Sequence, residues 1–89
     1  MSEQIPTIFV GKTKPIMAYV YASMKASQTT KKVKIVARGQ LIPDAVTIAE
    51  IFMRKIGKHD YTATIDSIEA VNKRGRNVFV STIEITVNV

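Results

Sequence analysis

The stretch IFVGKTKP, residues 8–15, runs from an apolar segment through a Gly-Lys-Thr turn to a proline that can open a helix. The nucleotide-binding P-loop has the same order of strand, turn and helix. That motif needs a glycine five residues before Gly11, and this chain has Pro6 there, without the N–H that a phosphate cradle requires. The stretch therefore predicts a strand-to-helix turn that does not bind ATP. Its Lys12 and Lys14 stand at a helix N-terminus, which favours anions.

Outward from this turn, apolar spacing predicts two strands and two helices. Residues 7–10 and 33–37 are short β-branched runs typical of buried strands. A first helix is expected from Pro15, and a second from residue 42 to about residue 56. Gly57 suits the left-handed cap that ends the second helix.

The apolar faces of both helices can be read from the same spacing. The first helix is expected to bury one stripe, formed by Met17, Val20, Tyr21 and Met24. Tyr19 is then expected at the surface or in an interface. The second helix carries its stripe at Ala45, Ile48, Ala49, Phe52 and Ile56, with Leu41, Ile51 and Met53 outside it. This is more apolar surface than one sheet face needs, and it indicates an oligomer contact.

The C-terminal third predicts a β-hairpin. Residues 61–65 alternate, but Ile65 and Ile68 are out of phase, so a bulge is expected near Asp66 and Ser67. The last strand alternates cleanly, with one face at Phe79, Ile83, Ile85 and Val87. The predicted order is β-α-β-α-β-β. This is an α/β chain of the α+β sandwich type, with a mixed four-stranded sheet and two helices on one face.

Composition limits the function classes. The chain has 89 residues and a net charge of +6, so we expect one domain over residues 1–89, with a short flexible segment at 1–6, and a polyanionic partner. It has no cysteine and one histidine, which predicts no metal site and no cofactor. Because the N-terminus resembles no signal peptide and no membrane span is visible, a cytoplasmic protein that does not bind membranes is expected.

Two groups of cations are candidates for contact with that polyanion. If the first two strands are parallel, Lys12, Lys14, Arg38 and the neutral donor Gln40 gather at one edge of the sheet. The predicted hairpin tip adds Lys73, Arg74 and Arg76. Solvated loop lysines and edge protection are the alternatives, and the coincidence of two groups favours nucleic-acid binding.

Enzymatic function is not expected. The carboxylates show no paired spacing, and neither an activated nucleophile nor a general-base histidine is apparent. No aromatic pair is expected on an open sheet face, which argues against stacking of single-stranded bases as in an RRM. A small-anion or nucleotide-binding enzyme is the rival class, but the sequence shows none of the catalytic residues that such an enzyme needs.

Three blocks carry a resemblance to a known family: VGKTKPIMAYVYA, IVARGQLIPDAVTIAEI and VFVSTIEITV. In this order, from about residue 8 to residue 87, they resemble the signature blocks of the Alba family of small basic archaeal chromatin proteins. The resemblance implies the fold of the C-terminal domain of a bacterial translation initiation factor. It also implies a homodimer that binds double-stranded DNA, and RNA, without strong sequence preference, at the chromosome (nucleoid). The alternative it implies is an RNA-binding ribonucleoprotein component with a role like that of a ribonuclease P subunit.

The resemblance also assigns residues. It places the nucleic-acid contacts at the residues already singled out in the turns and the hairpin tip: Lys12, Lys14, Arg38, Gln40, Lys73, Arg74 and Arg76. Lys12 and Lys14 are the candidates for acetylation, which implies a deacetylase partner. Contacts between neighbouring dimers fall at Phe52 and Ile56. Two departures stand out: Thr13 separates the paired lysines, and the hairpin is shorter than in many relatives, which predicts a reduced reach.

Overall fold

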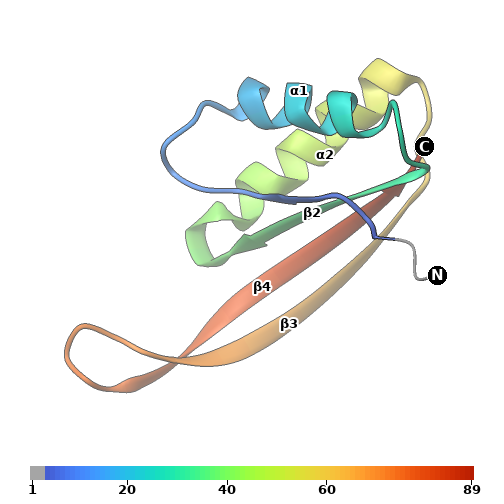
Figure 1. The fold of residues 1–89 in the computed structure, drawn as a ribbon. Coiled ribbons are helices and arrows are strands. Elements are labelled where there is room, and N and C mark those ends of the chain that lie inside the picture. Colours follow the sequence, from blue (N-terminus) through green and yellow to red (C-terminus); the bar gives the residue numbers. More distant parts are fainter. Residues whose placement is uncertain (1–3) are drawn as a thin grey trace.

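A parallel pair of strands organises the sheet. In the computed structural model, which describes residues 4–89, β1 (Thr7–Phe9) lies beside β2 (Lys32–Arg38), with Phe9 opposite Val36. Two long antiparallel strands complete the sheet in the order β1-β2-β4-β3; they are β3 (Tyr61–Val71) and β4 (Asn77–Asn88). Helices α1 (Ile16–Ala26) and α2 (Ile42–Ile56) both cover one face, as Figure 1 shows. The predicted α+β class and mixed four-stranded sheet are confirmed.

The core lies between the helices and the central strands. Alternate residues of β2 and β4 point toward the helices and are buried: Val33, Ile35, Ala37, Ile83, Ile85 and Val87. They meet the apolar stripe of α2, which is amphipathic as predicted and ends at a left-handed Gly57 (φ 73°). A short 3₁₀ turn (Gly39–Leu41) joins β2 to α2.

The predicted stripe of α1 is wrong at one of its four residues: Val20 is buried and Met17 and Met24 pack against the core, but Tyr21 is exposed. Tyr19 is buried and Tyr21 is exposed, the reverse of the expectation. The buried side of α1 includes a polar residue, Ser23. Its hydroxyl donates a hydrogen bond to the carbonyl of Tyr19 (2.9 Å), so the serine is buried without an unsatisfied hydrogen-bond donor. A search for apolar residues at helical spacing misses such a face, because it does not count a serine as buried.

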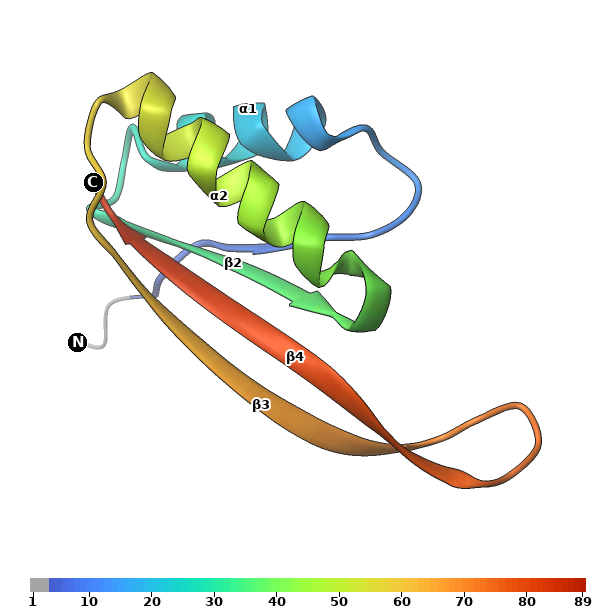
Figure 2. The same ribbon diagram turned by 180° about the vertical axis from the view of Figure 1, so that it is seen from behind.

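The predicted bulge is also wrong. β3 and β4 pair without interruption from Tyr61 opposite Val87 to Val71 opposite Asn77. Ile65 and Ile68 therefore lie on opposite faces of the ribbon. No bulge is needed, because this part of the hairpin extends beyond the helices and has no single buried face to maintain (Figure 2).

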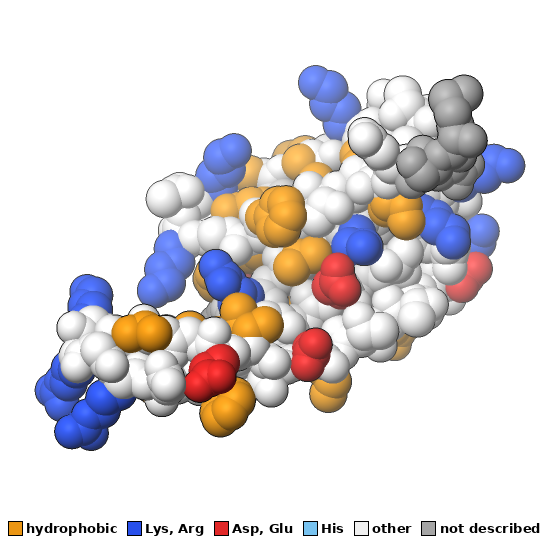
Figure 3. Space-filling view, turned by 60° about the horizontal axis from the view of Figure 1, so that its bottom comes forward, with side chains coloured by type: hydrophobic (Ala, Val, Ile, Leu, Met, Phe, Trp, Pro, Cys, Tyr) orange, Lys and Arg blue, Asp and Glu red, His pale blue; other side chains and the backbone are white. Residues whose placement is uncertain are grey.

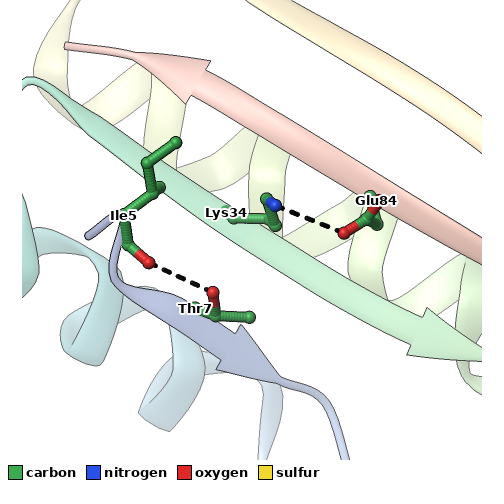
Figure 4. A network of polar contacts seen from close by, with 4 residues as sticks. All are labelled: Ile5, Thr7, Lys34 and Glu84. Carbon is green, nitrogen blue, oxygen red and sulfur yellow. Dashed lines mark hydrogen bonds and ion pairs between the residues drawn. The ribbon is translucent and has the colours of Figure 1, made fainter. Parts of the chain in front are cut away.

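The first residues of the chain were expected to be flexible as far as residue 6, and residues 1–3 of that segment lie outside the described part. Pro6 is tied to the sheet, because its carbonyl accepts a hydrogen bond from the N–H of Lys34 (2.9 Å). Thr7 adds a hydroxyl bond to the carbonyl of Ile5 (3.2 Å; Figure 4).

Candidate nucleic-acid interface

Two strand-to-helix connections leave the sheet at the same edge. β1 and β2 are parallel, and the N–H of Val10 bonds to the carbonyl of Val36 (2.9 Å), so Gly11 follows directly beside the end of β2. Lys12 and Lys14 on the first connection and Arg38 at the end of β2 are exposed. The expected gathering of these cations at one edge agrees with the strand order, and exposed Gln40 follows Arg38 in the 3₁₀ turn.

The helix start at this edge is open to an anion. α1 has no side-chain cap at Pro15 and no acidic residue in its first turn. Its leading N–H groups and its dipole therefore present partial positive charge beside the two lysines.

Tyr19 holds the lysine loop in place. Its buried side chain reaches back from α1, and its hydroxyl accepts a hydrogen bond from the N–H of Gly11 (3.0 Å). This bond joins the first residue of the loop to the helix that follows it. Nothing in the sequence pattern indicated such a role.

The hairpin tip is built around Asn72. Its side-chain oxygen accepts hydrogen bonds from the N–H groups of Arg74 (2.9 Å) and Arg76 (3.0 Å). Its backbone N–H bonds to the carbonyl of Arg76, and its carbonyl accepts from the N–H of Gly75. Gly75 has φ 77°, the left-handed conformation that suits glycine. The tip is therefore an ordered turn that displays Lys73, Arg74 and Arg76.

The hairpin leaves the sheet at the same edge as the two loops. β2 ends at Arg38, opposite Thr82, while β3 and β4 continue their pairing beyond that level. The two strands thus form an arm, defined here as residues 67–81, that starts beside Arg38. Figure 3 shows basic side chains gathered at the tip of the arm, with more along the adjoining edge.

Within residues 4–89, no carboxylate is paired with these cations. In residues 4–89 the ion pairs are Lys34 with Glu84 (3.4 Å; Figure 4) and Arg54 with Glu50 (2.7 Å), and neither involves the loops or the tip. The edge and the arm together therefore form a basic surface whose charges are available to an external polyanion.

The two residues expected between neighbouring dimers have different surroundings. Phe52 is fully buried (0% exposed) under the sheet, so the prediction that it contacts a neighbouring dimer is wrong for this conformation. The physical reason is that Phe52 belongs to the apolar stripe of α2, which packs against the sheet. Ile56, at the end of α2, is partly exposed and stays a prediction.

Across residues 4–89 no group of three His, Asp or Glu side chains lies close enough together to hold a metal ion. Among the same residues, no helix has the length and apolar character needed to cross a membrane.

Comparisons with known proteins relate this chain to a single family. The model of the family described as Alba matches residues 6–69. A protein of Nitrosopumilus maritimus (strain SCM1) named DNA/RNA-binding protein Alba is 41% identical over 91 residues, covering 97% of this chain and 93% of its own. The structure of Alba from Thermoplasma volcanium superposes with a TM-score of 0.78 at 38% identity, over 93% of this chain and 99% of that one. ALBA1 from Trypanosoma brucei shares the fold at 18% identity, with a TM-score of 0.64 over 97% of this chain and 71% of that one.

Proposed function

Because this chain belongs to the Alba family, we propose that it binds double-stranded DNA, and RNA, through their phosphates. The observation that supports this most is the basic surface formed by the loop cations and the arm tip, which has no ion-pair partner in the part of the chain that the structure describes. Phosphate contacts fix position without reading sequence, so binding is general. In a cell such a protein coats and compacts the chromosome, and it resides in the cytoplasm at the nucleoid.

The proposed binding unit is a homodimer. An apolar groove runs between α2 and the β3–β4 pair, lined by Val46, Met53, Tyr61 and Ile83 among others. On the same side, Ile65 is 81% and Phe79 78% exposed. A two-fold partner would bury this surface against its own copy. The two basic surfaces would then act together on one duplex.

Lys12 and Lys14 are the proposed sites of regulation. Acetylation removes the charge of a lysine, so it would weaken phosphate binding at the loop, and a deacetylase would restore it. The proposed contact between neighbouring dimers is now limited to Ile56.

The test is a gel-shift titration of unrelated DNA and RNA duplexes over a salt series. If a dimer contacts about six to eight phosphates, the logarithm of the binding constant falls with the logarithm of salt at a slope of roughly −5 to −7. A slope near zero, or a strong preference for one sequence, contradicts the proposal.

A second function, as an RNA-binding ribonucleoprotein component, is favoured by the name of the Nitrosopumilus relative, which includes RNA. Competition between duplex DNA and folded RNA at matched salt separates the two. Tighter binding of folded RNA favours the ribonucleoprotein role.

A further inference from the structure

One aromatic side chain stands on the open face of the sheet, away from both helices. Phe9 pairs with Val36, and that residue belongs to the face of β2 opposite the buried Ile35 and Ala37. The Phe9 side chain is 72% exposed. Neither the core nor the apolar groove beside α2 accounts for it, because both lie on the helix side.

A shallow hollow surrounds this aromatic ring. Its apolar part is formed by Phe9, Val36 and Leu41, and Arg38, Asp66 and Glu84 are polar members of its lining. Figure 3 shows this face, where hydrophobic side chains lie among basic and acidic ones. An apolar floor with a few charged groups around it is the composition expected of a small-ligand site.

We propose that this hollow binds one unpaired nucleobase, which stacks on Phe9 while Arg38 contacts its phosphate. The inference deepens the proposed nucleic-acid binding and rests on it. Arg38 belongs both to the basic surface and to the hollow, so a strand whose phosphate contacts Arg38 passes beside the Phe9 ring. Stacking of bases on aromatic side chains is a general mode of single-strand recognition and tolerates any base.

The charges around the hollow fix the direction of the strand. Asp66 lies on β3, across the sheet from Phe9, and repels phosphates, whereas the charge of Glu84 on β4 is paired with Lys34 (3.4 Å). The sugar-phosphate backbone must therefore run along the Arg38 side, with the base directed inward over Phe9. An amino group on the edge of that base can donate to a carboxylate, which a phosphate cannot do.

The site is selective for unpaired bases. In a duplex each base is stacked between its neighbours, so its face is not available to an aromatic ring. The sequence predicted no aromatic pair on an open sheet face, and the structure places a single ring there. One ring implies one stacked base per protomer.

Fluorescence provides the direct test, because the chain contains no tryptophan. A Phe9→Trp variant carries one tryptophan, at the stacking position. Short single-stranded DNA and RNA oligonucleotides should quench it, whereas an abasic oligonucleotide of equal length and a duplex of the same sequence should not. Quenching by single-stranded DNA or by single-stranded RNA supports the site. The strand that binds more tightly shows whether the stacked base comes from DNA or from RNA. Equal quenching by the abasic strand overturns it.

Affinity of the full-length protein provides the second test. Phe9→Ala should weaken single-strand binding by about 5- to 100-fold and leave duplex binding unchanged. Tyr21→Ala is the matched control, since Tyr21 is an exposed aromatic on α1, within the helix layer. The variant should fold, because most of the Phe9 side chain already faces solvent.

The two proposals fail in different ways. If Phe9→Ala binds single strands as the parent does, and duplex binding stays salt-dependent, the stacking site is wrong and the proposed function stands. If the parent binds neither single strands nor duplexes, the proposed function fails, and the stacking site with it.

Discussion

At the scale of single residues, a buried tyrosine determines how the lysine loop is presented. The phenol of Tyr19 contributes to the core, and its hydroxyl bonds to the N–H of Gly11 at 3.0 Å. A phenylalanine at this position could fill the core in the same way, but it has no hydroxyl to accept the hydrogen bond from Gly11. Tyr21, two residues later, faces solvent.

We expect Tyr19→Phe to lower the free energy of unfolding by about 0.5–1.5 kcal/mol, because the N–H of Gly11 loses its partner. Duplex affinity should also fall, by a few-fold at most, as the loop becomes less fixed. Chemical denaturation and a duplex titration measure the two effects. Tyr21→Phe removes an exposed hydroxyl and should change neither. Equal behaviour of the two variants would show that the bond to Gly11 does not matter.

At the scale of elements, strands and helices were largely predictable, and the exceptions have physical causes. The β-branched run of β2, the alternation in β4 and the apolar stripe of α2 all indicate burial, so these three elements were predicted correctly. Met53, which was expected outside the α2 stripe, is buried as well. The predicted α1 stripe failed at Tyr21 because the chain buries Tyr19, whose hydroxyl bonds to the N–H of Gly11, together with Ser23, whose hydroxyl bonds to the carbonyl of Tyr19. The false bulge came from assuming one buried face in a hairpin that extends past the core.

The candidate site was predictable to the same extent. The cations could be placed at one edge from the parallel order of two strands, which follows from the alternation of strands and helices. Side-chain bonds across the fold, such as that from Gly11 to Tyr19, depend on tertiary contacts and leave no local signal. The exposure of Phe9 left no local signal in the sequence either, because an apolar run of four residues does not indicate which of them faces solvent.

The arm tip depends on the backbone of Gly75. A Cβ at this position would meet nothing within 4 Å, so the cost of Gly75→Ala comes from its φ of 77° and is about 1–2 kcal/mol, local to the tip. We expect faster hydrogen exchange at Arg74 and Arg76 and weaker duplex binding. Gly75→Asn is the control, because asparagine tolerates the left-handed conformation, and it should preserve both properties. Equal exchange rates in the two variants would contradict a backbone origin.

At the scale of the whole molecule, the apolar groove and the exposed residues on the helix side of the hairpin account for the proposed dimer. Ile65 is 81% exposed on the helix side, so Ile65→Ser should weaken self-association without unfolding the chain. Sedimentation should show a parent dimer and a variant that shifts toward a 9.9 kDa monomer.

The control for this variant lies on the same strand. Ile68 pairs with Val80 on the opposite face of the ribbon, so Ile68→Ser should leave the dimer intact. A parent protein that sediments only as a monomer at micromolar concentration would contradict the dimer itself.

The central claim is that the basic edge and arm bind phosphates, and the salt dependence of loop variants tests it most directly. Lys12→Gln with Lys14→Gln removes two charges from the loop, whereas Lys31→Gln with Lys32→Gln removes two at the opposite end of β2. Both variants should keep their stability within about 0.5 kcal/mol, since all four lysines are exposed.

The measurement is the slope of duplex affinity against salt for the parent and both variants. The loop variant should bind every duplex more weakly, and its slope should be shallower by roughly four per dimer if all four loop lysines contact phosphate. The control variant should retain the parental slope. If the loop variant keeps the parental affinity and slope, the turn is only a connector, and the basic edge is not the binding surface.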